Sequence, residues 1–211
     1  MRCEEDVREL FVKNAIHLIA EGGFEKATTK NLTYSGGEIP GVKLNEVYIY
    51  RLFESKEGLY AEAFSQLDNE LFDAFLSGVY SVGGFEEDTT KKLFSFFELA
   101  WRFVLKDEDR CRAYVRFYYS VYFKGEILER HNRHFAVVID KLSPLFKEEA
   151  DIHSILHSAF TALLDFAIRV YNKELVDNEI NRPHVFNVLY CMMVTYFKRD
   201  IIKGTPITSL I

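Results

Sequence analysis

The stretch TTKNLTYSGGEIPGVKLNEVYIYRLFESKEGL, residues 28–59, decides how the N-terminal part of this chain folds. Both of its ends carry apolar residues at helical spacing, whereas its middle, SGGEIPG at residues 35–41, contains three glycines and one proline. Glycine permits backbone angles that other residues avoid, and proline fixes one angle and lacks an N–H group. The sequence therefore predicts two short helices that are separated by an irregular joint.

Helical signals also flank this stretch. Apolar residues recur at helical spacing over residues 7–18, and Gly22-Gly23 is a typical C-cap for the helix that contains them. Thr28 and Thr29 supply hydroxyl groups that can cap a short second helix. We expect a third helix at residues 44–52.

The rest of the chain continues the helical pattern. Ser55 is the expected N-cap of a fourth, long helix, and SVGGFEEDTT at residues 81–90 is the clearest linker. Neither strand alternation with turn signals nor an internal repeat is found. Helical periodicity resumes in five later segments: KKLFSFFELAWRFVL, RCRAYVRFYYSVYF, EILERHNRHFAVVIDKL, DIHSILHSAFTALLDFAIRVYN and RPHVFNVLYCMMVTYFKRDII. The sequence thus predicts an all-α protein of about nine helices.

Composition narrows the class of protein. The chain has 211 residues, 48% of them apolar, and a net charge of −6, so its overall charge does not indicate nucleic-acid binding. Residues 26–56 contain five basic and three acidic residues, a local excess of +2. The three cysteines form no CxxC pair, and no apolar run approaches the roughly 18 residues of a membrane span. We expect a soluble, cytoplasmic protein without membrane contact.

No catalytic motif is recognised. The sequence lacks GxSxG, HExxH and a phosphate-binding glycine loop. His153 and His157, and likewise His131 and His134, have spacings that allow two ligands to one metal ion. Neither pair has further ligands nearby in an established pattern, so hydrogen-bonded or exposed histidines are the favoured interpretation. We expect no metal ion, no cofactor and no enzymatic activity.

The opening stretch matches the helix-turn-helix plan, in which one helix braces the DNA backbone and the next lies in the major groove. Asn45 can form paired hydrogen bonds with a base edge, and Tyr48 can reach a thymine methyl group or a phosphate. Lys43 and Arg51 supply positive charge. Glu46 can accept a hydrogen bond from a cytosine amine, or it can simply repel DNA.

Two segments, FVKNAIHLIAEGGFEKATTKNL at residues 11–32 and NEVYIYRLFESKEGLYAEAF at residues 45–64, resemble the DNA-binding domain of the tetracycline-repressor (TetR) family of transcriptional regulators. The resemblance covers roughly residues 8–66. It implies a helix-turn-helix domain at residues 1–55 and a helical domain at residues 56–211 that dimerises and often holds a small effector. The joint is several residues longer than the family's usual Ala-Gly-Val-Ser turn, which implies altered base contacts.

By position, the resemblance implies that Thr28, Thr29, Tyr50 and Lys56 meet DNA phosphates, while the base-reading face includes Lys43 together with Asn45, Glu46 and Tyr48. The residues allow plainer roles as well. Thr28 or Thr29 can serve only as a cap, Tyr50 can belong to the core, and Lys56 can be ordinary solvated surface.

The C-terminal helices carry two further expectations. The segment AYVRFYYSVYF at residues 113–123 has six aromatic rings, which either pack as core or line an apolar ligand pocket. Apolar residues cover more than one face of the last two long helices, which indicates a homodimer interface within residues 150–203 or burial inside one chain. The candidate effector residues are Trp101, Tyr114, Phe117, Tyr118, Tyr122, His157 and Asp165.

Together these features predict a homodimeric, ligand-responsive transcriptional repressor. Its partners would be double-stranded DNA with a palindromic operator and a small-molecule effector. One alternative is a helical enzyme or small-molecule carrier whose N-terminal domain no longer binds DNA. A second alternative is a protein-interaction adaptor that uses the same surfaces.

Overall fold

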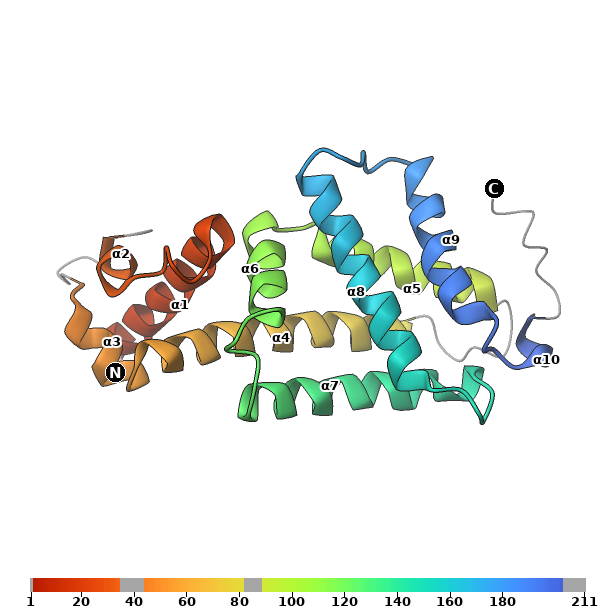
Figure 1. Ribbon diagram of the computed structural model, residues 1–211, viewed down its shortest axis with the longest axis horizontal. Coiled ribbons are helices and arrows are strands. Elements are labelled where there is room, and N and C mark those ends of the chain that lie inside the picture. Colours follow the sequence, from red (N-terminus) through yellow and green to blue (C-terminus); the bar gives the residue numbers. More distant parts are fainter. Residues whose placement is uncertain (1, 35–43, 82–88, 203–211) are drawn as a thin grey trace. The chain divides into compact units, whose positions relative to one another are not determined.

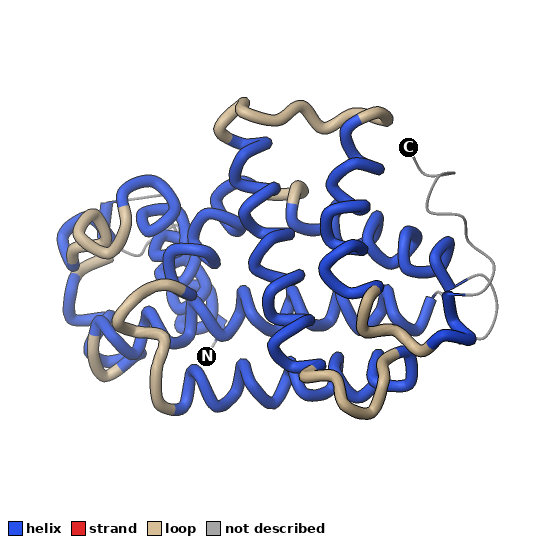
Figure 2. The backbone as a smooth tube through the Cα atoms, turned by 45° about the vertical axis from the view of Figure 1, so that its right-hand side comes forward, coloured by secondary structure: helices blue, strands red, loops and turns tan. Residues whose placement is uncertain are grey.

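The computed structural model describes residues 2–34, 44–81 and 89–202, and the statements below concern these residues (Figure 1). Within them the chain consists of helices and loops, as the tube in Figure 2 makes clear. The one β-type pairing among them is an isolated antiparallel bridge between Phe146 and Phe197. The all-α prediction is therefore confirmed. The SGGEIPG joint and most of the SVGGFEEDTT linker lie outside the described residues.

Ten α-helices and one short 3-10 helix follow one another along the described ranges, and the last α-helix has only four residues. In chain order they are α1 (Arg2–Gly22), α2 (Thr29–Tyr34), α3 (Glu46–Phe53), α4 (Lys56–Ser81), α5 (Thr89–Val104), α6 (Glu108–Tyr118), α7 (Glu126–Leu142), the 3-10 helix η1 (Ser143–Leu145), α8 (Ile152–Tyr171), α9 (Asn181–Val194) and α10 (Arg199–Ile202).

The helix ends follow the capping signals in the sequence. Gly23, just after α1, has a φ of +75°, a left-handed conformation that favours glycine. The Thr28 hydroxyl accepts a hydrogen bond from the N–H of Asn31 at 3.1 Å and so caps α2. At the start of α4, the Ser55 hydroxyl accepts from the N–H of Gly58 at 2.9 Å. Both predicted caps are confirmed.

The chain divides into two compact units. Unit 1 comprises Met1–Glu70 and Asp107–His131, and unit 2 comprises Leu71–Lys106 and Asn132–Ile211. Helix α4 contributes its first part to unit 1 and its second part to unit 2. The predicted helix-turn-helix segment thus shares its unit with α6 and the start of α7.

In unit 1, α1 packs along α6. The Arg116 guanidinium donates to the carbonyl oxygen of Ile19 at 2.9 Å, and His17 Nδ1 lies 2.6 Å from an Asp109 carboxylate oxygen. The inward face of α1 holds the apolar residues that the periodicity predicts: Val7, Phe11, Ala15 and Leu18. Burial of this stripe between α6 and the short helices explains why α1 is stable in this place.

In unit 2, α8 packs against α9 and α5 packs against α8. Figures 1 and 2 show the loop that joins α8 to α9 at one end of this pair. Pro183 lies in the first turn of α9, where its missing N–H costs nothing. None of the described helices is both long enough and apolar enough to cross a membrane.

Candidate functional site

Helix α3 is fixed to the rest of unit 1 by one face. Ile49 and Phe53 are buried there, and the Phe53 ring meets the edge of Phe11 with centroids 6.3 Å apart. The Arg8 guanidinium lies 4.8 Å from the centre of the Phe53 ring and also donates to the carbonyl oxygen of Leu52. Because these contacts come from α1 and from the end of α3 itself, the opposite face of α3 is held outward in a defined orientation.

Two buried hydrogen bonds position the segment around α2. The side-chain amide of Asn14, on α1, donates to the carbonyl oxygen of Leu32 at 2.9 Å. The Tyr60 hydroxyl, on α4, donates to the carbonyl oxygen of Ala27 at 2.6 Å, and burial raises the pKa of Tyr60. Sequence reasoning missed both residues, although a polar Asn14 on the apolar face of α1 was a visible signal.

The outward face of α3 carries most of the side chains that were predicted to contact DNA. Tyr48 is half-buried, and the exposed members are Asn45, Glu46, Tyr50 and Arg51. Two exposed apolar side chains of unit 1 were not foreseen: Val47 is 70% exposed and Tyr34, at the end of α2, is 80% exposed.

Lys43, the remaining candidate for base contact, lies outside the described residues. Of the candidates for phosphate contact, Tyr50 lies within α3, and the other three lie at helix starts. Thr28 and Thr29 stand at the beginning of α2, and Lys56 is the first residue of α4. The Lys56 ammonium lies 5.7 Å from the centre of the Tyr60 ring. Thr28 therefore acts as a cap, which leaves a phosphate contact from the same residue as a prediction.

Asn45 has a structural task at the start of α3. It is the N-cap, and its side-chain oxygen accepts a hydrogen bond from the N–H of Val47 at 3.0 Å. A paired contact with an adenine edge uses both the oxygen and the amide nitrogen of an asparagine. In this conformation the amide nitrogen is free of the cap, whereas the oxygen is shared with it.

Arg51 is partly neutralised by an acidic residue of α1. Its guanidinium lies 3.2 Å from a Glu4 carboxylate oxygen and 4.7 Å from the centre of the Tyr48 ring. Both members of the ion pair are about half exposed, so water weakens the pair. A DNA phosphate would have to replace Glu4 as the partner of Arg51. The sequence pattern gave no sign of this pair because Glu4 is distant along the chain.

Comparison with known proteins identifies this arrangement. No protein-family sequence model matches the chain, and no curated protein does. Solved structures do: a TetR family transcription regulator from Marinobacter aquaeolei VT8 superposes with a TM-score of 0.74 and 20% identity, over 94% of this chain and 100% of that chain. The chain has the TetR fold. The resemblance inferred from residues 8–66 is thereby confirmed as a likeness of fold along almost the whole chain.

Two further structures with the TetR fold carry functional names. SmeT, the repressor of the Stenotrophomonas maltophilia multidrug efflux pump SmeDEF, has a TM-score of 0.61 and 12% identity, with 95% of each chain covered. The fatty acid degradation regulator FadR from Bacillus halodurans has a TM-score of 0.62 and 14% identity, over 94% of this chain and 99% of its own.

The predicted effector residues are divided between the two units. Tyr114, Phe117, Tyr118 and Tyr122 belong to unit 1, whereas Trp101, His157 and Asp165 belong to unit 2. His157 is half-buried and Asp165 is exposed, both on α8.

The unit 1 rings pack tightly with other aromatic side chains. Phe24, between α1 and α2, has its ring centre 4.8 Å from that of Phe117 and 4.5 Å from that of Tyr122. Tyr114 stacks on Phe64 at 5.3 Å. Core packing, the alternative reading of the AYVRFYYSVYF segment, describes these contacts well.

A buried polar cluster lies beside these rings. The Tyr114 hydroxyl donates to Asp68 Oδ1 at 3.0 Å, and His131 Nδ1 lies 2.9 Å from the same oxygen. All three side chains are at most 3% exposed. Burial and the adjacent Asp68 carboxyl group raise the pKa of Tyr114 well above its ordinary value. The cluster joins α4, α6 and α7 within unit 1, and across the described ranges no group of three or more metal-ligating side chains gathers in one place.

Unit 2 contains an apolar cavity of about 90 Å³. Its walls come from α4, α5, α7, α8 and α9, and six phenylalanines form a large part of them: Phe75, Phe96, Phe97, Phe135, Phe160 and Phe186. The other lining residues are leucines, alanines, a valine and a methionine. Of the seven residues predicted for the effector site, all of which the structure describes, none is among the lining residues.

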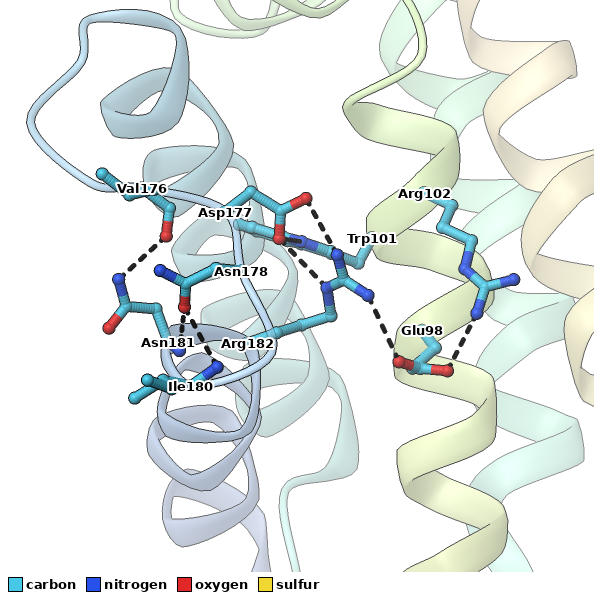
Figure 3. A network of polar contacts seen from close by, with 9 residues as sticks. All are labelled: Glu98, Trp101, Arg102, Val176, Asp177, Asn178, Ile180, Asn181 and Arg182. Carbon is cyan, nitrogen blue, oxygen red and sulfur yellow. Dashed lines mark hydrogen bonds and ion pairs between the residues drawn. The ribbon is translucent and has the colours of Figure 1, made fainter.

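Trp101 instead anchors the loop between α8 and α9 (Figure 3). Its indole N–H donates to an Asp177 carboxylate oxygen at 2.9 Å, and its ring stacks on Phe97 at 5.7 Å. Arg182, at the start of α9, donates two hydrogen bonds to Asp177, each of 3.0 Å, and lies 3.6 Å from Glu98 on α5. The loop is thereby tied to α5.

The Asp177 contacts lead us to expect that the stability of unit 2 falls in acid. Burial acts to raise the pKa of Asp177, but hydrogen bonds from Arg182 and Trp101 outweigh it and hold the pKa below its ordinary value of 3.8. A lowered folded-state pKa stabilises the fold above the unfolded-state pKa, and this contribution is lost as the pH falls through the folded-state value.

We therefore expect Asp177→Asn to lower the unfolding free energy at pH 7 by about 1–3 kcal/mol, and by less near pH 3. Urea unfolding at both pH values measures the difference. Asp165→Asn, which removes the same charge from the exposed face of α8, is the control. A difference between wild type and Asp177→Asn that grows as the pH falls would contradict the expectation.

Proposed function

We propose that this protein is a sequence-specific DNA-binding transcriptional regulator, a repressor that acts as a homodimer and responds to a small molecule. The observation that carries the proposal is the outward face of α3, which bears Asn45, Tyr50 and Arg51. The buried contacts on the opposite face of α3 hold it in place. The TetR fold of the whole chain supports it. So do SmeT and FadR, whose names describe regulators. A transcriptional regulator of this kind binds DNA in the cytoplasm and catalyses no reaction, so the proposal includes a cytoplasmic location and no enzymatic activity.

In the proposed complex α3 lies in the major groove. Asn45, Glu46 and Tyr48, together with Lys43, would meet base edges, while Tyr50, Arg51 and Lys56 would meet phosphates along with Thr28 and Thr29. Phosphate contacts fix the register of a protein on DNA, and base contacts select the sequence. Glu46 narrows the choice of bases because a carboxylate accepts only from a donor such as the cytosine amine.

Variants of Asn45 test base contact separately from helix capping. Asn45→Ser keeps an N-cap oxygen but removes the amide donor, whereas Asn45→Ala removes both. We expect Asn45→Ser to retain the thermal stability of the wild type and to lose about 1–3 kcal/mol of binding at the selected DNA site, with one base position relaxed. Titration of fluorescent duplexes measures the binding.

Asn45→Ala should lose a similar amount of binding and, in addition, about 1 kcal/mol of stability. If Asn45→Ser binds and discriminates like the wild type, Asn45 serves only as a cap, and the proposed register of α3 on DNA is wrong.

The proposed dimer uses the outward faces of α8 and α9. One face of α9 is buried within the chain by Val185, Phe186 and Leu189. The other face still carries apolar groups, among them Val188, which is 47% exposed, and the exposed Cys191. A helix that is apolar on both faces is covered in full only when a second chain packs on it.

Val188→Glu should therefore convert the dimer into a monomer. A charge buried at a subunit interface without a partner is costly, and in the single chain the same side chain stands in water. Analytical ultracentrifugation at micromolar concentration measures the change. Val137→Glu, at a valine of α7 that is 43% exposed, is the matched control and should leave the dimer intact. A dimer that survives Val188→Glu would place the interface elsewhere.

The effector would bind in unit 2 and shift an equilibrium between two conformations of the dimer. The two conformations would differ in the distance between the α3 helices of the two subunits. An apolar cavity lined by five helices is the observation that supports this part of the proposal. The same cavity would also suit a small-molecule carrier that does not bind DNA. Sequence-specific DNA binding separates the two functions, since a carrier would lack it.

A further inference from the structure

The unit 2 cavity differs from most ligand sites in its chemistry. Ligand pockets usually combine apolar walls with a few polar groups that orient the ligand. Here every lining side chain among the residues that the structure describes is apolar, from Phe75 on α4 to Met193 on α9. The polar cluster around Asp177 lies at the loop between α8 and α9, and its residues are not among those that line the cavity.

A cavity of this kind disfavours the binding of charged ligands. A carboxylate or ammonium group inside it would give up its hydration and find no hydrogen-bonding side chain on the described walls. Water gains little there as well, because a water molecule in a protein interior needs two to four polar partners. An apolar cavity of about 150 Å³ in another protein stays dry and binds benzene. The volume of about 90 Å³ here suits a small ring or a slender chain.

We propose that the cavity in unit 2 binds an uncharged hydrocarbon group, a single ring or a short alkyl chain, and rejects its carboxylate counterparts. The inference rests on the proposed function, because it names the chemical class of the effector. The sequence suggested an effector site of mixed aromatic and polar residues, whereas the site proposed here is lined by apolar residues.

The fluorescence of Trp101 can report binding in the cavity. Trp101 is the single tryptophan of the sequence. It stacks on Phe97 with ring centres 5.7 Å apart, and Phe97 is one of the lining residues. A molecule that enters the cavity will displace or restrain the Phe97 ring. The emission of Trp101 should therefore change when the cavity fills.

The experiment titrates the full-length protein with four probes: toluene, n-hexane, benzoate and hexanoate. Toluene and hexane should change the Trp101 emission in a saturable manner and raise the melting temperature. Benzoate and hexanoate should do neither at the same concentrations. A response to only one of the two hydrocarbons would identify the ligand as a ring or as a chain. Equal responses to the carboxylates, or no saturable response to either hydrocarbon, would overturn the proposal.

Two leucines of α8 give a matched pair of variants. Leu163 lines the cavity, whereas its neighbour Leu164 is equally buried and does not. Leu163→Ala enlarges the cavity, so it should bind naphthalene roughly tenfold more tightly than the wild type does. Leu164→Ala should bind naphthalene as the wild type does. Equal effects of the two variants would assign binding to another place. Should Leu163→Ala fail to fold, the milder Leu163→Val makes the same comparison.

A DNA titration distinguishes failure of this inference from failure of the proposed function. If the protein binds hydrocarbons but prefers no DNA sequence, the proposed ligand class is supported and the proposed regulatory function is refuted. If it binds a specific DNA site but no hydrocarbon, the regulator stands and the ligand class is refuted. When both hold, saturating toluene or hexane should change the affinity for the DNA site.

Discussion

Gly58→Ala is expected to abolish sequence-specific DNA binding and to lower the free energy of unfolding. A β-carbon at position 58 would lie 2.0 Å from the carbonyl oxygen of Phe53, the last residue of α3. That atom belongs to the backbone, so no side-chain rotation relieves the clash. Either α3 or the first turn of α4 must move, which changes the position of the outward face of α3, the proposed DNA-binding surface.

Overpacking of this kind costs on the order of 3 kcal/mol. Thermal unfolding gives the stability, and titration of the selected duplex gives the affinity. Asp73→Ala is the control, because Asp73 is exposed on the same helix, α4, and its replacement brings no new atom close to a neighbouring backbone. It should leave the unfolding free energy within about 0.5 kcal/mol of the wild type. A Gly58→Ala protein with the stability and DNA affinity of the wild type would contradict the described contact between α3 and α4.

Asp68→Ala is expected to lower the unfolding free energy by about 3–5 kcal/mol. It removes the oxygen that Tyr114 and His131 share in the interior of unit 1 and leaves a void between α4, α6 and α7. For a chain of this size such a loss lowers the melting temperature by roughly 10 °C. Urea unfolding followed by circular dichroism gives the free energy directly.

Glu70 on the same helix is the matched control. It forms an ion pair with Arg110, and both side chains are about one-third exposed. Glu70→Ala should cost less than about 1 kcal/mol, because exposed ion pairs contribute little. If Asp68→Ala and Glu70→Ala cost the same, the Asp68 cluster does not stabilise unit 1 in the way we describe.

Local signals in the sequence predicted the helices well. Apolar spacing located α1 and α4, and the hydroxyls of Thr28 and Ser55 marked the starts of α2 and α4 because capping depends on residues only a few positions apart. The prediction of α3 at residues 44–52 was close to Glu46–Phe53. Its start differs because Asn45, which was assigned to base contact, forms the cap.

Tertiary contacts were harder to predict. Glu4 and Arg51, or Asp68 and His131, meet only after the helices have packed, and no spacing rule connects them. The aromatic segment around Phe117 was recognised as unusual, but whether its rings line a cavity or pack as core depends on which helices face it. Phe24 and Phe64 face it, and their rings pack against Phe117.

The proposed effector site illustrates the same limit. The lining residues of the unit 2 cavity, such as Leu93, Leu156 and Leu189, are ordinary members of apolar helix faces. A void among such residues forms where the side chains of five packed helices leave space between them. Apolar periodicity in the sequence does not predict such a void. Its volume could be recognised only from the packed structure.

The most direct measurement of the central claim is the selection of bound duplexes from random DNA by the full-length protein. We predict that selection enriches a palindrome whose two half-sites are spaced by about one helical turn or a multiple of it, as two α3 helices of a dimer require. A pool that remains random after repeated rounds, although the protein is folded and dimeric, would contradict the proposal that it is a sequence-specific regulator.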